Sequence, residues 1–439
     1  MPKPEPLQRH SPVTSLFAAL VCFAAYACIS AFRKAFNVAS YEGYTLLGLD
    51  FKVVIVITQV AGYMASKFYG IRFISGLKRL GRGKLILLLI ALSWLAWLLF
   101  ALIPPPYNFW TLALNGFPLG MLWGVVFSYV EGRRATDFIG AALAVSFIFG
   151  PGLAKSVAQL VMTDWGVSEY WMPFVTAGIF FIPLLLFVWG LEKIPLPSPY
   201  DVAHRTERVP MSGEDRKTFL LTFLPGIVLL VLVYILATIL REVRDGFMAD
   251  MWQASGEPFE PGVFAKTETL ISLGILALIA SMVIIHNNLK AFLLAQWIVL
   301  AGFIFSGLIT WLYTEGRIGT FSWMTFVGLG LYMSYIPYNS LLFDRMLAAF
   351  RYTANVGFLI YVADSFGYLA SVSVLLTKTI FKLQLNWLDF YINLVLFSSV
   401  IGGLFTLFSI VYFKRQYNRS AIIKVGAIAA VSPGVAKDV

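Results

Sequence analysis

Six basic residues lie inside stretches of the sequence that are otherwise apolar: Arg33, Lys34, Lys67, Lys155, Arg241 and Arg244. An ionised side chain inside a bilayer costs at least about 2.5 kcal/mol, so each of them requires an acidic partner, a water-filled cavity or a function. Arginine binds phosphate or carboxylate through two parallel hydrogen bonds, and lysine adds a point charge. We therefore predict an anion site formed by Arg33, Lys34, Lys67 and Arg241.

Acidic residues in the same stretch as Arg241 are candidate partners for its charge. Arg241 and Asp245 lie four residues apart, on one face of a helix, so they could form an ion pair. Arg244 points away from that face. We expect Arg241 to face a cavity and Arg244 to pair with Glu242, with Asp250 or with solvent.

The other embedded lysines leave alternatives open. Lys155 is expected either to pair with Asp364 or to face the cavity. Arg33 and Lys34 could instead extend to the outer membrane interface, and Lys67 could extend to the cytoplasmic interface, because long basic side chains reach water in this way.

Aromatic side chains on the same apolar segments are candidates to line the cavity, with simple packing as the alternative. These residues are Tyr26, Tyr63, Trp123, Tyr234, Tyr335 and Tyr338.

Catalytic and metal-binding patterns are missing from the sequence. It contains no HExxH motif, no phosphate-binding glycine loop and no cluster of Cys and His, and both cysteines, Cys22 and Cys28, lie in the first apolar segment. We therefore expect no metal, no cofactor, no disulfide framework and no enzymatic activity.

The composition identifies the elements that must position these side chains. Of 439 residues, 59% are hydrophobic and 13% are charged, and the mean hydropathy is +0.79. Soluble domains are about 45–50% apolar and about 25% charged. The sequence therefore predicts an all-α membrane protein that crosses the bilayer many times, and the first apolar segment lacks the cleavage site of a signal peptide.

A transmembrane helix needs about 20 apolar residues. The sequence contains twelve such segments: 14–40, 51–73, 84–103, 109–131, 137–162, 171–191, 218–250, 266–286, 289–313, 320–344, 352–377 and 389–413. A polar loop over 192–217 divides them into six-helix bundles at 14–191 and 218–413, with tails at 1–13 and 414–439.

The distribution of basic residues predicts the orientation. Of the 33 Lys and Arg residues, 22 lie in the tails, the central loop and the gaps on their side, and five lie in the gaps on the other side. Because cytoplasmic loops are enriched in Lys and Arg, both termini are expected in the cytoplasm, in a bacterial inner membrane. The net charge of +10 then reflects topology, and no nucleic-acid partner is expected.

Related patterns in the two halves indicate a duplicated six-helix unit. Tyr26 precedes Arg33 by seven residues, and Tyr234 precedes Arg241 by the same number. The fourth span of each half also contains a Leu-Gly pair. Small residues in these two spans are expected to allow close helix packing; they are Gly120, Gly124, Gly328, Gly330 and Ser334.

The twelve spans, the central loop and the half-repeats resemble the major facilitator superfamily. RKAFNVA at 33–39 and GYMASKFYG at 62–70 are similar to motifs of its organophosphate:phosphate antiporter family. The resemblance implies two pseudo-symmetric halves and a phosphate group held between Arg33 and Arg241, with Lys67 adding charge. The sequence departs from the pattern in lacking an acid between spans two and three and a histidine in span five.

We therefore expect a secondary transporter of a small organic anion, such as an organophosphate exchanged for phosphate, that works by rocking of its two halves. Cations left unpaired in the site would repel one another, which would favour exchange. The alternatives are a transporter of another solute with the same fold, and a membrane sensor that retains an anion site. The expected partners are the anion and the lipid bilayer, and the expected state is a monomer.

Overall fold

The computed structural model describes residues 12–75, 81–130, 136–196, 213–258, 260–283, 285, 287–350, 356–380 and 386–431. Most of the expected N-tail and central loop, and the turns with Arg133, Arg134 and Arg351, lie outside the described residues. What the structure describes is almost entirely helical, as the composition predicts.

The N-terminal half contains α1 (Pro12–Lys34), α2 (Phe51–Ser75), α3 (Arg82–Leu102), α4 (Thr111–Phe127), α5 (Thr136–Thr163) and α6 (Met172–Lys193). The C-terminal half contains α8 (Gly213–Ala254), α9 (Val263–Val283), α10 (Asn288–Thr314), α11 (Thr320–Ser340), α13 (Val356–Ile380) and α14 (Trp387–Val431). The shorter elements are η1 (Ala35–Val38), β1 (Thr45–Leu46), β2 (Leu49–Asp50) and α12 (Leu342–Phe350). β1 and β2 form an antiparallel hairpin.

Each of the twelve predicted spans overlaps one of the twelve main helices of the two halves, which confirms the predicted fold class. Within the described residues, eight helices are long and apolar enough to cross a membrane by length and composition alone. Several boundaries differ from the prediction. The first span was expected to reach residue 40, but α1 ends at Lys34 and is followed by the 3₁₀ turn η1. The tenth span divides into α11 and α12, and α14 continues to Val431, well past the expected end of the bundle at residue 413. Hydropathy locates the segment inside the bilayer, whereas backbone hydrogen bonds decide where a helix ends.

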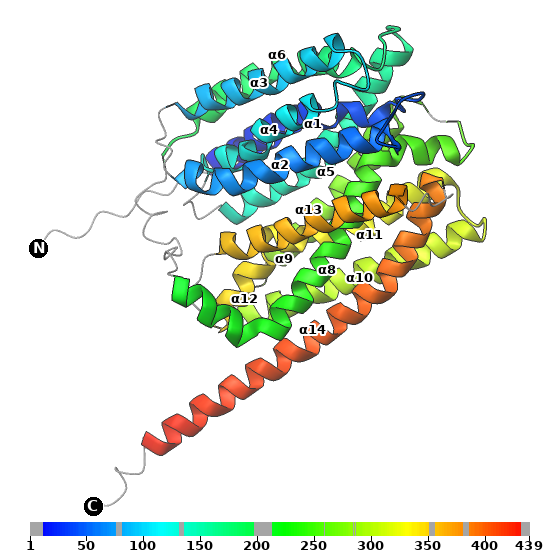
Figure 1. The fold of residues 1–439 in the computed structure, drawn as a ribbon. Helices are drawn as coiled ribbons and strands as arrows, with labels where there is room; N and C mark the ends of the chain where they lie inside the picture. Colours follow the sequence, from blue (N-terminus) through cyan, green and yellow to red (C-terminus); the bar gives the residue numbers. More distant parts are fainter. Residues whose placement is uncertain are drawn as a thin grey trace, which may run out of the picture.

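The helices are arranged as two halves side by side (Figure 1). α1 to α6 form one half, and α8 to α14 form the other. Across the interface, α2 contacts α13 and α5 contacts α9. α1 begins and α14 ends at the same end of the bundle, which we call the terminal end, and the β1–β2 hairpin lies at the opposite end.

Burial separates inner helices from peripheral ones. In the most apolar window of each helix, 72% of residues are buried in α5 and 67% in α1, but only 39% in α3, α6 and α14. The peripheral helices present large apolar side chains outward, such as Leu88 on α3, Ile182 on α6 and Phe408 on α14. These faces suit contact with lipid, and the inner helices carry the charged residues.

Glycines bring helices within each half close together, as predicted. A Cβ atom on Gly120 of α4 would lie 2.7 Å from the carbonyl oxygen of Tyr63 on α2. In the other half, a Cβ atom on Gly330 of α11 would lie 2.7 Å from the carbonyl oxygen of Gly302 on α10. Both positions admit only hydrogen, which confirms their packing role.

Candidate anion-binding site

The end of α1, which carries Arg33 and Lys34, is fixed by side chains from its own half. A helix ends with carbonyl groups that lack intrahelical partners. Asn115 of α4 and Trp97 of α3 donate hydrogen bonds to the Phe32 carbonyl at 3.1 and 2.7 Å. Gln59 of α2 donates to the Arg33 carbonyl at 2.9 Å and to the Asn115 side chain at 2.7 Å. This buried network positions the basic pair.

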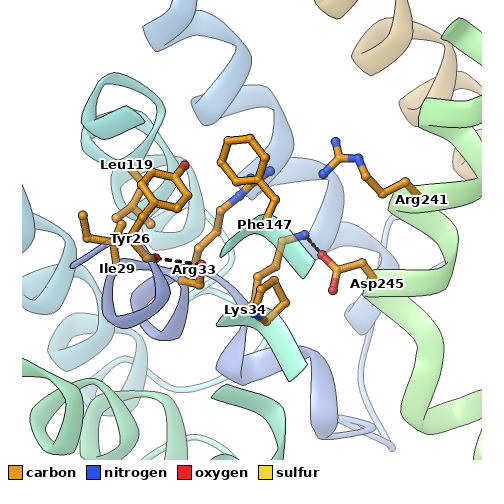
Figure 2. Close-up of a pocket in the computed structure, with 10 residues that line it drawn as sticks. Tyr26, Ile29, Arg33, Lys34, Leu119, Phe147, Arg241 and Asp245 are labelled. Atoms are coloured by element: carbon orange, nitrogen blue, oxygen red, sulfur yellow. Dashed lines mark hydrogen bonds and ion pairs between the residues drawn. The ribbon is translucent and has the colours of Figure 1, made fainter. Parts of the chain in front are cut away.

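A cavity lies between the halves beside this end of α1. Its lining comprises Tyr26, Ile29, Ser30, Arg33, Lys34, Leu119, Phe147, Pro151, Arg241 and Asp245. The guanidinium groups of Arg33 and Arg241 project toward one another across it (Figure 2). The cavity volume of about 30 Å³ holds about one or two water molecules, so the cavity in this structure is too small for an organic anion.

Arg33 has hydrogen-bond donors that no described residue accepts. Its side chain is 12% exposed, and its guanidinium carbon lies 3.7 Å above the Tyr63 ring. Its Nε and Nη2 atoms are buried and have no hydrogen-bond partner among the described residues. Its acidic neighbour is Glu242, 3.9 Å from Nη2. Unpaired buried N–H groups of this kind are costly unless a further acceptor binds them.

Arg241 makes an ion pair with its neighbour in sequence. Its Nη2 atom lies 2.5 Å from Glu242 and donates to the Tyr368 hydroxyl at 3.3 Å. Its guanidinium carbon lies 4.6 Å from the centre of the Tyr335 ring, and its Nε atom has no partner in the part of the chain that the structure describes. The predicted pairing of Arg241 with Asp245 is therefore wrong.

Asp245 pairs with two lysines of the other half instead. Lys34 of α1 and Lys155 of α5 both lie 2.5 Å from its carboxylate, and Asn37 donates to its carbonyl at 3.2 Å. This carbonyl precedes a kink of α8 at Phe247. Spacing along one helix could not reveal these partners, since they come from α1, η1 and α5.

Lys67 of α2 bridges to α13 in the other half, where it pairs with Asp364. Tyr234 of α8 donates to the same carboxylate at 2.5 Å, and the Lys67 ammonium lies 5.3 Å from the Tyr63 and Tyr368 ring centres. The expectation that Lys155 could pair with Asp364 is wrong, because Lys67 holds that carboxylate. Extension of Lys67 to the membrane interface is wrong for the same reason.

Arg244 lies outside the cavity, in the C-terminal half. It pairs with Glu268 of α9 at 2.6 Å and donates to the Met324 carbonyl at 3.2 Å. The predicted partners Glu242, Asp250 and solvent are therefore wrong. Glu268 also contacts α5, since a Cβ atom on Gly152 would lie 2.4 Å from its Cγ.

The aromatic candidates divide into three groups. Tyr26 lines the cavity, and Tyr63 and Tyr335 pack against the two arginines. Tyr234 binds Asp364, on the terminal side of the cavity. Trp123 stacks on Phe127 at 5.0 Å, and Tyr338 packs against Tyr234 at 5.2 Å and Phe343 at 5.7 Å. Neither Trp123 nor Tyr338 lines the cavity, so packing explains both.

Ion pairs join the two halves at three levels. Lys52 and Asp250 pair at 2.5 Å near the opposite end, followed by the Asp245 cluster and then by Lys67 with Asp364. Within the described ranges, every such pair takes its cation from the N-terminal half and its acid from the C-terminal half. The acids of the C-terminal half therefore offset part of the repulsion that was expected among the site cations.

Sequence reasoning missed three residues of this arrangement. Glu242 was expected only as a partner of Arg244, although it contacts both cavity arginines. Tyr368 follows Asp364 by four residues, so helical periodicity could have placed both on one face. Glu268 is an acid inside a predicted span, and an embedded charge is itself a signal of a buried partner.

The sequence matches the model of DUF5690, described as a family of unknown function, over residues 35–416. The chain belongs to the DUF5690 family. In this DUF5690 protein the matched region contains Tyr63, Lys67 and Arg241 and begins directly after Lys34. A search of curated proteins gives no match.

The structure of this DUF5690 protein is similar to that of a bacterial homologue of the human drug peptide transporters PepT1 and PepT2. The TM-score is 0.57 and the sequence identity is 13%, with 92% of this chain and 98% of that chain covered. The similarity shows a major facilitator fold, and the long apolar helices of the described residues indicate a multi-pass integral membrane protein. At this identity the substrate must be argued from the site.

Proposed function

We propose that this protein is a secondary transporter of a small organic anion, with organophosphates and phosphate as the expected class. The observation that carries the proposal is Arg33, whose buried guanidinium faces Arg241 across the cavity with two unpartnered nitrogens. An oxyanion between these arginines would accept hydrogen bonds from both planar groups. Each half contributes one arginine, so binding would draw the halves together.

The charge of the whole cluster supports an anion. The described charged residues in and around the cavity are six cations, Arg33, Lys34, Lys67, Lys155, Arg241 and Arg244, and four acids, Glu242, Asp245, Glu268 and Asp364. The resulting surplus of two positive charges lies in a medium of low dielectric, where an anion with one or two charges offsets it.

A second candidate is a zwitterionic solute such as a small peptide. The observation that favours it is Asp245, an acid that lines the same cavity as Arg33 and Arg241. The carboxylate of Asp245 already has two lysine partners. It would therefore bind the amine of a zwitterion less strongly than the two arginines would bind an anion. The third candidate, a sensor, would bind the anion without transporting it.

We expect the protein to work by alternating access, with exchange of one anion for another. Both termini are expected on the cytoplasmic side of a bacterial inner membrane, and the functional unit is expected to be a monomer. Catalysis forms no part of the proposal.

Counterflow in proteoliposomes tests the function. Vesicles loaded with phosphate are offered labelled phosphate, glycerol phosphate, hexose phosphate, a dicarboxylate, a dipeptide or a neutral sugar. We expect exchange of at least one phosphorylated anion, reduced more than about 100-fold by Arg33→Ala with Arg241→Ala, since each lost charged contact costs about 1.5–3 kcal/mol. Arg317→Ala is the control, because Arg317 is exposed in a loop.

Transport of a neutral solute that survives the double substitution would overturn the anion site. Exchange of the dipeptide but of no phosphorylated anion would favour the zwitterion, and binding without exchange would favour the sensor.

A further inference from the structure

The arginine clamp, defined as Arg33 and Arg241, contains a carboxylate of the protein itself. Glu242 lies 2.5 Å from Arg241, 3.9 Å from Arg33 and 3.6 Å from Lys34, and its side chain is 2% exposed. The carboxylate of Glu242 thus lies between a cation of each half. A bound oxyanion would take the same kind of position.

Glu242 differs in this respect from the other buried acids. Asp245 has two close lysine partners. Asp364 has Lys67 and Tyr234, and Glu268 has Arg244. In the part of the chain that the structure describes, only Glu242 is within ion-pair distance of both Arg33 and Arg241.

A substrate anion and Glu242 therefore compete for the same guanidinium groups. The charged groups around Glu242 are Arg33 and Lys34 from α1 and Arg241 and Asp245 from α8, with Lys155 of α5 held on Asp245. If an anion takes both arginines, Glu242 retains only Lys34, which Asp245 already engages at 2.5 Å. A buried carboxylate that loses its cationic partners is most stable when it binds a proton.

We propose that Glu242 occupies the arginine clamp until a substrate anion displaces it, and that it then takes up one proton, which couples anion transport to protons. The proton comes from water, and the carboxylate becomes a neutral carboxylic acid. On release of the anion the proton leaves and Glu242 returns to the clamp. This inference rests on the proposed function. It adds that the carrier can reorient without a second anion, so exchange is not obligatory.

Proton uptake on binding provides the test. The full chain in detergent is titrated calorimetrically with inorganic phosphate, in two buffers of different ionisation enthalpy. We expect the wild type to take up about one more proton per phosphate than Glu242→Gln. Because the same phosphate is used for both proteins, protons that phosphate itself binds or releases cancel in this difference. The variant should bind phosphate about tenfold more tightly at neutral pH if Glu242 occupies the clamp about nine-tenths of the time.

The pH dependence has a defined sign. Because binding takes up a proton, the affinity of the wild type should rise as the pH falls, beyond the change seen for Glu242→Gln. In proteoliposomes, an inward proton gradient should drive accumulation of labelled phosphate by the wild type. Glu242→Gln should lose this accumulation while still binding phosphate in the calorimeter. Glu260→Gln, which removes an exposed carboxylate, should match the wild type.

Equal proton uptake by the wild type and Glu242→Gln would overturn the inference and leave the proposed function intact. Loss of the extra proton in Asp364→Asn but not in Glu242→Gln would also overturn it. Absence of phosphate binding to the wild type would overturn both proposals. Should Glu242→Gln fail to fold, infrared difference spectra of the wild type decide the question: a protonated carboxyl band must appear when phosphate is added.

Discussion

At the scale of single residues, the site depends on which charged side chains still have hydrogen-bond donors without a partner. Lys34 and Lys155 are engaged by Asp245, and Lys67 by Asp364. Arg33 instead rests on the Tyr63 ring, which orients its planar group while leaving hydrogen-bond donors free. A charge that is buried, oriented and incompletely paired is a better candidate for binding than one in a complete ion pair.

Replacing Arg33 by lysine tests this distinction. Arg33→Lys keeps the charge but loses the planar fork and the ring contact, so anion affinity should fall about 10- to 100-fold, equivalent to one charged hydrogen bond. Phosphate binding measured by calorimetry gives the result, with Arg317→Lys as the exposed control. Unchanged affinity would show that charge alone suffices and that the bidentate geometry has no role.

At the scale of elements, α1 is held by polar residues that have no charge. Asn115 donates to the Phe32 carbonyl and to Ser93 of α3, and accepts from Gln59. These side chains are buried, so they satisfy backbone groups that would otherwise remain unpaired. The network keeps the end of α1 at the depth where Arg33 faces Arg241.

Asn115→Leu keeps the approximate volume and removes these hydrogen bonds. Each buried polar group left without a partner costs about 1–3 kcal/mol, so we expect a lower melting temperature in detergent and weaker phosphate binding. Asn393→Leu, at an exposed position on α14, is the matched control. A stable Asn115→Leu variant with normal binding would mean that the remaining contacts of α1 position Arg33 without the network.

At the scale of the whole molecule, the halves differ in charge at their interface. The N-terminal half supplies lysines at three levels and the C-terminal half supplies the acids. Lys52 and Lys67 are separated by 15 residues of α2, or about 22 Å of helix, so the pairs extend over much of the depth of the bundle. If the halves rock as proposed, pairs at one end or the other would break and re-form.

Exchanging the two charges of the Lys67–Asp364 ion pair tests the part of this pair in the movement. Lys67→Asp and Asp364→Lys should each reduce transport strongly, since each leaves a like-charged buried pair. The double exchange should recover part of the activity, with a coupling energy of about 0.5–3 kcal/mol. The exposed pair Lys266–Glu260 is the control and should show little coupling. Additive losses at Lys67 and Asp364 would show that the pair does not act as a unit.

The sequence by itself determined the membrane class, the twelve helices and the two halves, because apolar length and periodicity are properties of contiguous residues. It also singled out the six embedded cations, since a charge in an apolar segment is conspicuous without any structure. Only the tertiary structure decided which acid meets which cation. Asp245, Asp364 and Glu268 find partners on other helices, and Glu242 lies between two arginines that are 208 residues apart. Pairing across a bundle depends on helix packing, which local spacing does not encode.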